Sequence, residues 1–260
     1  MGKPSKREEI NLEDCAFYGQ FNEGSKGTQE FFQIYPALRE KGQIITSSDN
    51  FILIPDIAPI TTDHLLVVPK NHFRSFASLP KSFNKELEQI VSEVINKMQK
   101  FHPSSEIIAF EHGMGIIGAQ TIMCGGCGRT EHAHLHILPV RKDNDGGGVG
   151  KKLKQIISQN FNLTNKESLP LPRLNIGALT GKLPYLYFWS SMMNSSLIFI
   201  QDSLKISIPS QLIRKLIFNE MPRIKGEESK WDWREYILFN AKQGERMLLD
   251  TLNRWGSKEL

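Results

Sequence analysis

The stretch EHAHLHILP, residues 131–139, restricts the local fold more than any other part of the chain. His132, His134 and His136 alternate there with small or apolar residues, although the whole chain of 260 residues has seven histidines. Side chains alternate between the two faces of a β-strand. The pattern therefore predicts a strand whose three imidazoles share one face, while the residues between them face a hydrophobic core.

Several kinds of chemistry are compatible with this row of histidines. Same-face residues lie roughly 6.6 Å apart along a strand, so the outer two are about 13 Å apart. A zinc ion needs Zn–N bonds of roughly 2.0–2.1 Å, so two imidazoles can share a metal more easily than three. Alternatively, the middle imidazole is a nucleophile, which requires one free ring nitrogen and the other held as an N–H donor. Three histidines with structural hydrogen bonds in a core are the remaining reading.

A glycine-rich loop, GGCGRT at 125–130, directly precedes the histidines. The backbone N–H groups of such a loop can surround a phosphate, because glycines allow close approach. A phosphate site beside a nucleophilic histidine suggests phosphoryl or nucleotidyl transfer. Cys124 and Cys127 in the same region are compatible with half of a zinc site, with a redox pair, or with a flexible glycine-rich loop that holds two thiols. A mixed cysteine and histidine site that includes His112 also stays open.

The rest of the chain predicts an α+β fold. From Phe83 to Phe101 apolar residues recur at helical spacing, which predicts an amphipathic helix. Alternating or apolar runs predict strands at 42–56 (a pair around the turn Asp49-Asn50), 59–70, 106–113, 184–189 and 196–201. Further helices are predicted near 151–161, 209–219 and 232–255.

A polar, glycine-rich stretch divides the chain and sets the predicted domain organisation. It predicts a disordered tail at 1–13, a catalytic domain at 14–142, a linker at 143–150 and a C-terminal α/β extension at 151–260. The net charge of +4 comes partly from the tail and gives no indication of a nucleic-acid partner. Three cysteines and the lack of a signal or membrane-spanning segment favour a cytoplasmic protein.

Two segments in the first half resemble the motifs of the histidine triad (HIT) superfamily. HAHLHILP is similar to its signature, and FILIPDIAPITTDHLLVVPKNH at 51–72 is similar to its upstream segment. The resemblance covers roughly residues 15–140 and implies a HIT-like antiparallel sheet with packed helices. In the second half, SQLIRKLI and WDWRE resemble the C-terminal extension of larger bacterial HIT hydrolases.

The resemblance implies a role for each matching residue. His134 would attack the α-phosphorus and carry a transient nucleotidyl group, His132 would orient it, and His136 and His64 would contact the phosphate. Asp56 would hold the ribose hydroxyls. The remaining implied substrate contacts are the side chains of Ile54 and Ile57 at the base, and the backbone of Gly128, Arg129 and Thr130 at the phosphate.

Together these roles predict a hydrolase that cleaves a nucleoside 5′-phosphoanhydride, phosphoramidate or dinucleoside polyphosphate. His136 stands where transferase and phosphorylase branches usually have glutamine, which favours water as the acceptor. No metal is required, although Mg²⁺ would screen a polyphosphate substrate, and a homodimer would be in keeping with the family. The alternatives are a nucleotidyltransferase or phosphorylase, a non-catalytic nucleotide-binding scaffold, and a metalloenzyme with His132 and His134 as ligands.

Two positions depart from the family pattern. Glu111 replaces the usual asparagine or glutamine before the glycine-rich loop, and a carboxylate near phosphate is unfavourable unless it is turned away or protonated. Tyr18 stands where some relatives have the second of two zinc-binding cysteines, so that Cys15 has no partner there. The sequence therefore predicts no zinc site at the N-terminus.

Overall fold

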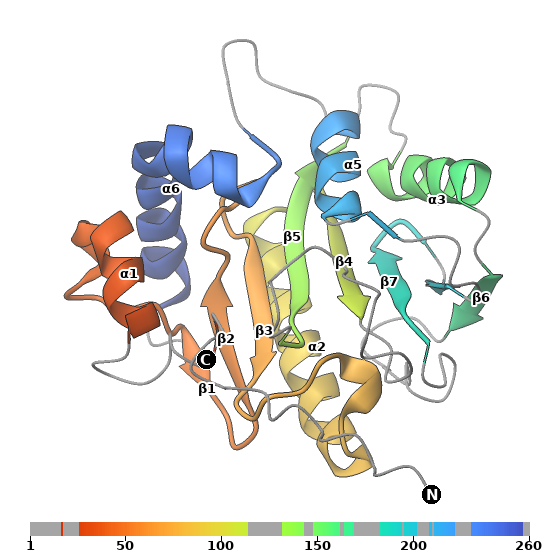
Figure 1. The fold of residues 1–260 in the computed structure, drawn as a ribbon, viewed down its shortest axis with the longest axis horizontal. Coiled ribbons are helices and arrows are strands. Elements are labelled where there is room, and N and C mark those ends of the chain that lie inside the picture. Colours follow the sequence, from red (N-terminus) through yellow and green to blue (C-terminus); the bar gives the residue numbers. More distant parts are fainter. Residues whose placement is uncertain are drawn as a thin grey trace, which may run out of the picture.

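A sheet of eight strands forms the centre of the computed structural model (Figure 1). The structure describes residue 17 and residues 26–113, 132–142, 148–161, 164–168, 183–193, 195–201, 208–209, 211–221 and 230–256, without the side chains of 26–29 and 164–168. The strands are β1 (Thr46–Ser47), β2 (Phe51–Pro55), β3 (Leu65–Pro69), β4 (Ser105–Gly113), β5 (Leu135–Arg141), β6 (Thr164–Ser168), β7 (Tyr185–Ser190) and β8 (Ser196–Ile200).

The strands lie in the order β1-β2-β3-β5-β4-β7-β8-β6, and each neighbouring pair is antiparallel. The junction between the two halves of the chain is the β4–β7 pair, which runs from Ile108 opposite Ser190 to Gly113 opposite Tyr185. Strands from the second half therefore extend the sheet built by the first half.

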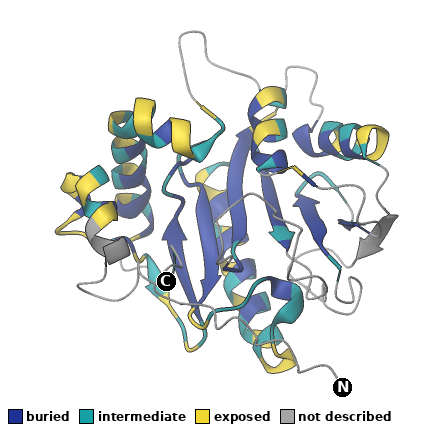
Figure 2. Ribbon diagram, viewed as in Figure 1, coloured by how far each residue is buried: buried dark blue, intermediate teal, exposed yellow. Residues whose placement is uncertain are grey.

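One face of the sheet is covered by α2 (Asn84–Phe101), the helix predicted from its apolar spacing. Its side chains Leu87, Val91, Val94, Ile95 and Met98 are buried in one core with residues of β2, β3, β4 and β5. The i, i+3, i+4, i+7 spacing places them on one stripe of the helix. Figure 2 shows the strands at the centre as buried, and α2 at the lower centre with buried, intermediate and exposed residues.

The opposite face is covered by two helices of the second half, α3 (Val149–Asn160) and α5 (Leu212–Glu220), at the upper right of Figure 1. Their buried apolar residues form a second core with the even-numbered side chains of β4 and β5 and with residues of β7 and β8. This is the face that also carries His136, because Leu138 and Val140 follow it at two-residue spacing. The second half of the chain thus packs on the histidine face of the sheet.

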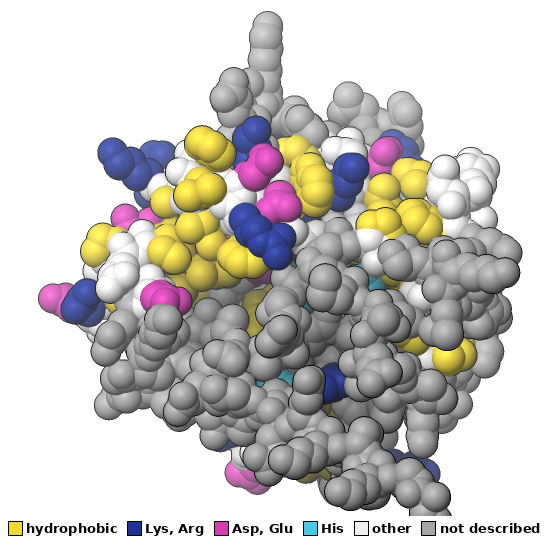
Figure 3. All heavy atoms as spheres, in the orientation of Figure 1, with side chains coloured by type: hydrophobic (Ala, Val, Ile, Leu, Met, Phe, Trp, Pro, Cys, Tyr) yellow, Lys and Arg dark blue, Asp and Glu magenta, His cyan; other side chains and the backbone are white. Residues whose placement is uncertain are grey.

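Helices α1 (Lys26–Ile34) and α6 (Trp233–Trp255) lie together on the left of Figure 1. They share a smaller core that includes Tyr35, Leu248 and Leu252. Figure 3 shows apolar side chains gathered over this region, and on α6 the side chains of Leu238 and Phe239 are 74% and 72% exposed. Within the described ranges no helix is both long and apolar enough to cross a membrane.

The short helical turns are η3 (Pro36–Leu38), η4 (Phe76–Ser78) and η5 (Lys81–Phe83). The predicted α+β class is confirmed, and every helix and strand predicted within the described ranges is present with shifted ends. The strand predicted at 59–70 is shorter, because residues 56–64 form a loop before β3. Helix α1 and strand β6 were not predicted.

Candidate active site

The loop between β2 and β3 carries two of the predicted site residues, Asp56 and His64, at its ends. The backbone N–H of Asp56 donates to the carbonyl of His64 over 2.8 Å, which closes the loop. Asp63 has a φ of 66°, in the left-handed region that few non-glycine residues adopt. Helix α6 holds it there, because Arg254 pairs with its buried carboxylate and Thr251 Oγ1 accepts from its N–H over 2.9 Å. The loop therefore depends on the C-terminal helix for its shape.

His134 has the hydrogen bonding that a nucleophilic imidazole requires. Its Nδ1 lies 2.8 Å from the carbonyl oxygen of His132. Because a carbonyl only accepts, Nδ1 carries the proton and Nε2 has a free lone pair. His134 is partly exposed, whereas His132 and His136 are 2% and 7% exposed. Of the three imidazoles, the middle one is the most accessible.

The first two histidines precede the hydrogen-bonded part of the predicted strand, since β5 begins at Leu135. The carbonyl of His132 accepts from an imidazole, and the N–H of Ala133 donates over 2.6 Å to Phe73 in the segment after β3. These partners stand in for a strand ladder at residues 132–134. Ala133 and Leu135 still face the core shared with α2, as predicted.

His132, which precedes the middle histidine in the row, is held by a backbone hydrogen bond and by a ring contact. Its Nε2 donates to the carbonyl of Pro69 over 2.7 Å. The ring of His72 lies against it, with centroids 5.0 Å apart, and the ring of Phe17 lies 5.0 Å from that of His134. Neither His72 nor Phe17 was predicted to lie near the site. His72 could have been suspected only from its place in the upstream motif.

His64 and His136 form a buried pair with a defined proton arrangement. The N–H of Ile60 donates to His64 Nδ1 over 3.2 Å, so the proton of a neutral His64 lies on Nε2. That Nε2 is 2.9 Å from His136 Nδ1. Donation across this contact leaves His136 with its proton on Nε2, the nitrogen on the far side of the ring. The ring of His136 also stacks on Phe110 at 4.3 Å and lies 4.8 Å from the ring of His134.

Asp56 contacts this pair and is only 4% exposed. Its Oδ2 lies 3.4 Å from His64 Nε2 and 3.3 Å from His136 Nδ1. Its Oδ1 accepts from the N–H of Ala58 over 2.7 Å. The nearest cation is Arg214 of α5, whose Nη1 is 2.8 Å from Oδ2. Both carboxylate oxygens therefore have partners, and the predicted contact to ribose hydroxyls would have to be made alongside them.

Arg214 itself is 5% exposed, and each of its three side-chain nitrogens donates to an oxygen. Besides the pair with Asp56, its Nη2 donates to the carbonyl of Ala58 over 2.6 Å and its Nε to that of Trp231 over 3.3 Å. A buried charge without such partners would be strongly unfavourable. The guanidinium is thus fixed beside the histidine cluster by oxygens of the β2–β3 loop and by the carbonyl of Trp231.

Burial dominates the protonation of the cluster. It lowers the pKa of His134 and of His136 to about 4, and the neighbouring imidazole adds to the effect on His134. For Asp56, burial alone would raise the pKa, but the charge of Arg214 together with His64 and His136 brings it below its ordinary value. At neutral pH the site therefore holds neutral imidazoles beside one ionised carboxylate and one guanidinium.

A metal is disfavoured at the point where ligand atoms converge. Asp56, His64 and His136 bring ligand-type atoms within 4.8 Å of one another, and the described residues contain no other such cluster. Arg214 already places a positive charge at 2.8 Å from the carboxylate. A cation would be repelled there, and the His64–His136 hydrogen bond would have to break.

The structure brings Asp56, His64, His134 and His136 together, and it places the predicted residues Ile54 and Ile57 in two different apolar clusters. Ile54 is buried with residues of β2 and β3, whereas Ile57 packs against the core of α1 and α6. Their joint contact to a base stays a prediction. The predicted phosphate-binding backbone of residues 128–130 lies outside the described ranges, as do Cys124, Cys127 and Cys15.

Glu111 is turned away from the histidines. Its neighbours Phe110 and His112 have the opposite side-chain direction on β4, and Phe110 is the residue stacked on His136. Glu111 Oε1 accepts from the N–H of Phe76 over 2.8 Å, and Oε2 accepts from the hydroxyl of Tyr185. Burial raises the pKa of Glu111 to about 8. The carboxyl group is therefore both turned away and neutral at pH 7.

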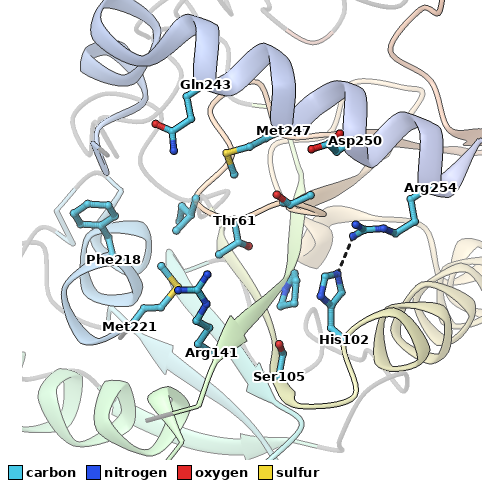
Figure 4. Close-up of a pocket in the computed structure, with 13 residues that line it drawn as sticks. Thr61, His102, Ser105, Arg141, Phe218, Met221, Gln243, Met247, Asp250 and Arg254 are labelled. Carbon is cyan, nitrogen blue, oxygen red and sulfur yellow. Dashed lines mark hydrogen bonds between the residues drawn. The ribbon is translucent and has the colours of Figure 1, made fainter. Parts of the chain in front are cut away.

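A cavity of about 440 Å³ lies beneath α6, beside the loop between β2 and β3 (Figure 4). Thr61 and Arg141 face it from the loop and the end of β5, and Gln243 and Met247 face it from α6. None of the predicted site residues lines it. The cavity is thus separate from the histidine cluster, although the β2–β3 loop borders both.

Known proteins are similar to this chain in the segment that contains the histidine cluster. Residues 29–154 match the family model described as "Scavenger mRNA decapping enzyme C-term binding". An uncharacterized HIT-like protein of Borreliella burgdorferi is 29% identical over 112 residues, which is 42% of this chain and 74% of that protein. Adenosine 5′-monophosphoramidase HNT1 of Candida albicans is 26% identical over 98 residues, 36% of this chain and 59% of that protein.

The solved structures give a weaker likeness. Yeast Ap4A phosphorylase Apa2 in complex with Ap4A is 12% identical with a TM-score of 0.39, and the alignment covers 85% of this chain and 81% of that one. A HIT-like protein of Bartonella henselae is 20% identical with a TM-score of 0.31, over 42% of this chain and 78% of that one. At these TM-scores the likeness supports no conclusion.

Proposed function

Because the chain belongs to the histidine triad (HIT) superfamily, we propose that it is a nucleotide hydrolase that acts through a nucleotidyl group on His134. The observation that carries the proposal is the hydrogen bond from His134 Nδ1 to the carbonyl of His132. It leaves Nε2 unprotonated on the most accessible imidazole of the cluster.

The reaction has two steps. First, a bond forms between His134 Nε2 and the α-phosphorus while the bond to the leaving group breaks, and the leaving group departs with its electron pair and takes up a proton from the solvent. Then a water oxygen attacks the phosphorus and gives a proton to the solvent, while the phosphorus–nitrogen bond breaks and its electron pair returns to His134 Nε2. A nucleoside 5′-monophosphate is released. The His132 carbonyl stabilises the positive charge that the substituted imidazole carries between the steps.

The neighbouring groups supply binding and no further covalent chemistry. His136 has its proton on Nε2 and can donate it to a phosphate oxygen, while His64 holds that tautomer. The backbone of residues 128–130 is proposed as the remaining phosphate contact. Asp56, Ile54 and Ile57 are proposed to contact the nucleoside.

The substrates to test first follow from the relatives. One of them, from Candida albicans, is named as an adenosine 5′-monophosphoramidase. Adenosine 5′-phosphoramidate is therefore the leading probe, with guanosine 5′-phosphoramidate and a dinucleoside tetraphosphate beside it. The wild-type chain is expected to release the monophosphate, and chelation of divalent ions is expected to leave phosphoramidate hydrolysis unchanged.

The decisive variant is His134→Ala. It is expected to lose at least about 10³-fold in kcat because the nucleophile is gone. Its circular dichroism and thermal unfolding should match the wild type. Mass spectrometry of quenched wild-type reactions should find a nucleotide adduct on His134. Full activity in the folded variant would refute the mechanism, and a product formed only with phosphate as acceptor would make the protein a phosphorylase.

A further inference from the structure

The second half of the chain contributes a charged side chain to the predicted nucleotide site. Arg214 comes from α5, outside the segment that matches the family model. It is buried, and its Nη1 lies 2.8 Å from Asp56. We propose that Arg214 is a positioning residue, which holds the Asp56 carboxylate so that the proton of the His64–His136 pair stays between the two rings. The role in phosphate binding rests on the proposed function, whereas the control of the proton does not.

The reason is a competition for one proton. His64 Nε2 is 2.9 Å from His136 Nδ1, and Asp56 Oδ2 lies nearly as close to it, at 3.4 Å. His136 Nδ1 is likewise 3.3 Å from the same oxygen. A carboxylate attracts a proton more strongly than a neutral imidazole nitrogen does, because charge-assisted hydrogen bonds are roughly twice as strong as neutral ones. Without a cation, Oδ2 would accept from both rings, and His136 would then carry a proton on Nδ1.

Arg214 weakens this competition in two ways. Its guanidinium donates directly to Oδ2 and so takes up part of the accepting capacity of that oxygen. Its positive charge also makes it less favourable for a neighbouring imidazole to become cationic. The carboxylate is held in place from its other side by the N–H of Ala58, and Arg214 in turn donates to the carbonyl of that residue.

Loss of the guanidinium therefore has a specific consequence. Asp56 would remain buried as an anion and would draw a proton onto His136 Nδ1, either as the other neutral tautomer or as an imidazolium. The groups that face His136 in this arrangement are Asp56, His64, His134 and the ring of Phe110. With Arg214 removed, none of these offers a positive charge at neutral pH to balance the carboxylate.

The test is the protonation state of His136, read from long-range proton–nitrogen NMR spectra of the full chain at pH 7. In the wild type, Nδ1 of His136 is expected to be unprotonated. In Arg214→Met it is expected to become protonated, with the pKa of one imidazole of the pair raised by about 1 unit or more. Lys215→Met is the matched control, because the exposed Lys215 lies on the same turn and loses the same charge. It should leave His136 unchanged.

A second variant separates control through Asp56 from a general structural role. In Asp56→Asn/Arg214→Met both charges are gone, so His136 Nδ1 should return to the unprotonated state, whereas mere loss of packing would not be reversed. If His136 Nδ1 stays unprotonated in folded Arg214→Met, or stays protonated in the double variant, the inference is wrong.

Activity then links the inference to the proposed function. On adenosine 5′-phosphoramidate, Arg214→Met is expected to lose about tenfold or more in kcat, and Arg214→Lys to recover part of it. If the wild type has no activity on any nucleotide but the NMR changes occur, the proposed function fails and the control of the proton stands. If the wild type is active and the NMR changes do not occur, this inference alone fails.

Discussion

Replacement of Glu111 by Gln is expected to remove one specific pH dependence from the stability of the protein. Glu111 is 2% exposed, and burial raises its pKa from the ordinary value of 4.5 to about 8. The folded state therefore binds a proton that the unfolded state releases at pH values between these limits. Glutamine has nearly the same shape, can accept from the N–H of Phe76, and needs no proton to be neutral.

The direction and the size of this pH dependence follow from the pKa values of Glu111 in the unfolded and folded states, 4.5 and about 8. The contribution of protonated Glu111 is fully present below pH 4.5 and is lost as the pH rises through 8. One extra proton in the folded state makes the free energy of unfolding fall by about 1.4 kcal/mol per pH unit. Across the window the loss amounts to a few kcal/mol, which is a large part of the stability of an ordinary domain.

The assay is denaturant unfolding of the wild type and Glu111→Gln at pH 5, 6, 7 and 8. The difference in free energy of unfolding should grow in favour of the variant by up to about 1.4 kcal/mol for each unit of rising pH. Glu40→Gln, at an exposed position, should show no such trend. Parallel curves for the wild type and Glu111→Gln would mean that Glu111 is ionised in the fold, and the reasoning would be refuted.

Two further predictions concern the histidine cluster and α3. Burial lowers the pKa of five histidines to about 4, namely His64, His112, His132, His134 and His136. The unfolded state therefore binds more protons below pH 6.5, so the free energy of unfolding of Glu111→Gln should fall steeply from pH 6.5 to 4. A flat profile would show that these histidines are already charged in the fold. Gly150→Ala should lower the free energy of unfolding by about 1–3 kcal/mol, because its Cβ would lie 2.6 Å from Ser190 Cβ and 2.8 Å from Glu106 Oε1. The control Ser158→Ala, on the exposed side of α3, should change it little in the same denaturant titration. Equal effects of the two variants would contradict the close packing at Gly150.

The sequence predicted those parts of the site that depend on local pattern. Two-residue spacing was enough to place His132, His134 and His136 apart from Ala133 and Leu135, and the structure buries those two apolar side chains in the core of α2. The upstream motif placed Asp56 and His64 on one loop, and the sheet register then sets Leu65, the residue directly after that loop, opposite Ile137 of β5. Alternation and motif order are local signals, so one sequence is sufficient to read them.

Arg214 could not be placed in the site by the same means. The sequence LIRKLI contains two adjacent cations, and helical spacing alone does not decide whether Arg214 or Lys215 is buried. The useful signal was that Arg214 and Phe218, four residues apart, fall on one stripe with Ile217, since a buried arginine requires a carboxylate partner. Which carboxylate it meets depends on how α5 packs on the sheet, and that is a long-range property.

The alternation of side chains likewise could not predict the hydrogen bond that orients His134. A row of imidazoles suggested that neighbouring rings would orient one another, but the acceptor of the Nδ1 proton is the backbone carbonyl of His132. That carbonyl is available because the chain at Ala133 bonds to Phe73 and only joins the sheet ladder at Leu135. A delayed start of a strand has no signature in side-chain alternation.

The position of the second half explains why the predicted site needs both parts of the chain. On β5, the face that bears His136 continues into Leu138 and Val140, which pack against α3 and α5. Because one strand face serves both the cluster and that core, the helix that covers the core also reaches the β2–β3 loop, and Arg214 meets Asp56 there. Removal of α5 would therefore expose apolar side chains and leave a buried carboxylate without its cation, two losses of several kcal/mol each. The charge balance of the cluster and the burial of the sheet are thus stabilised by the same helix.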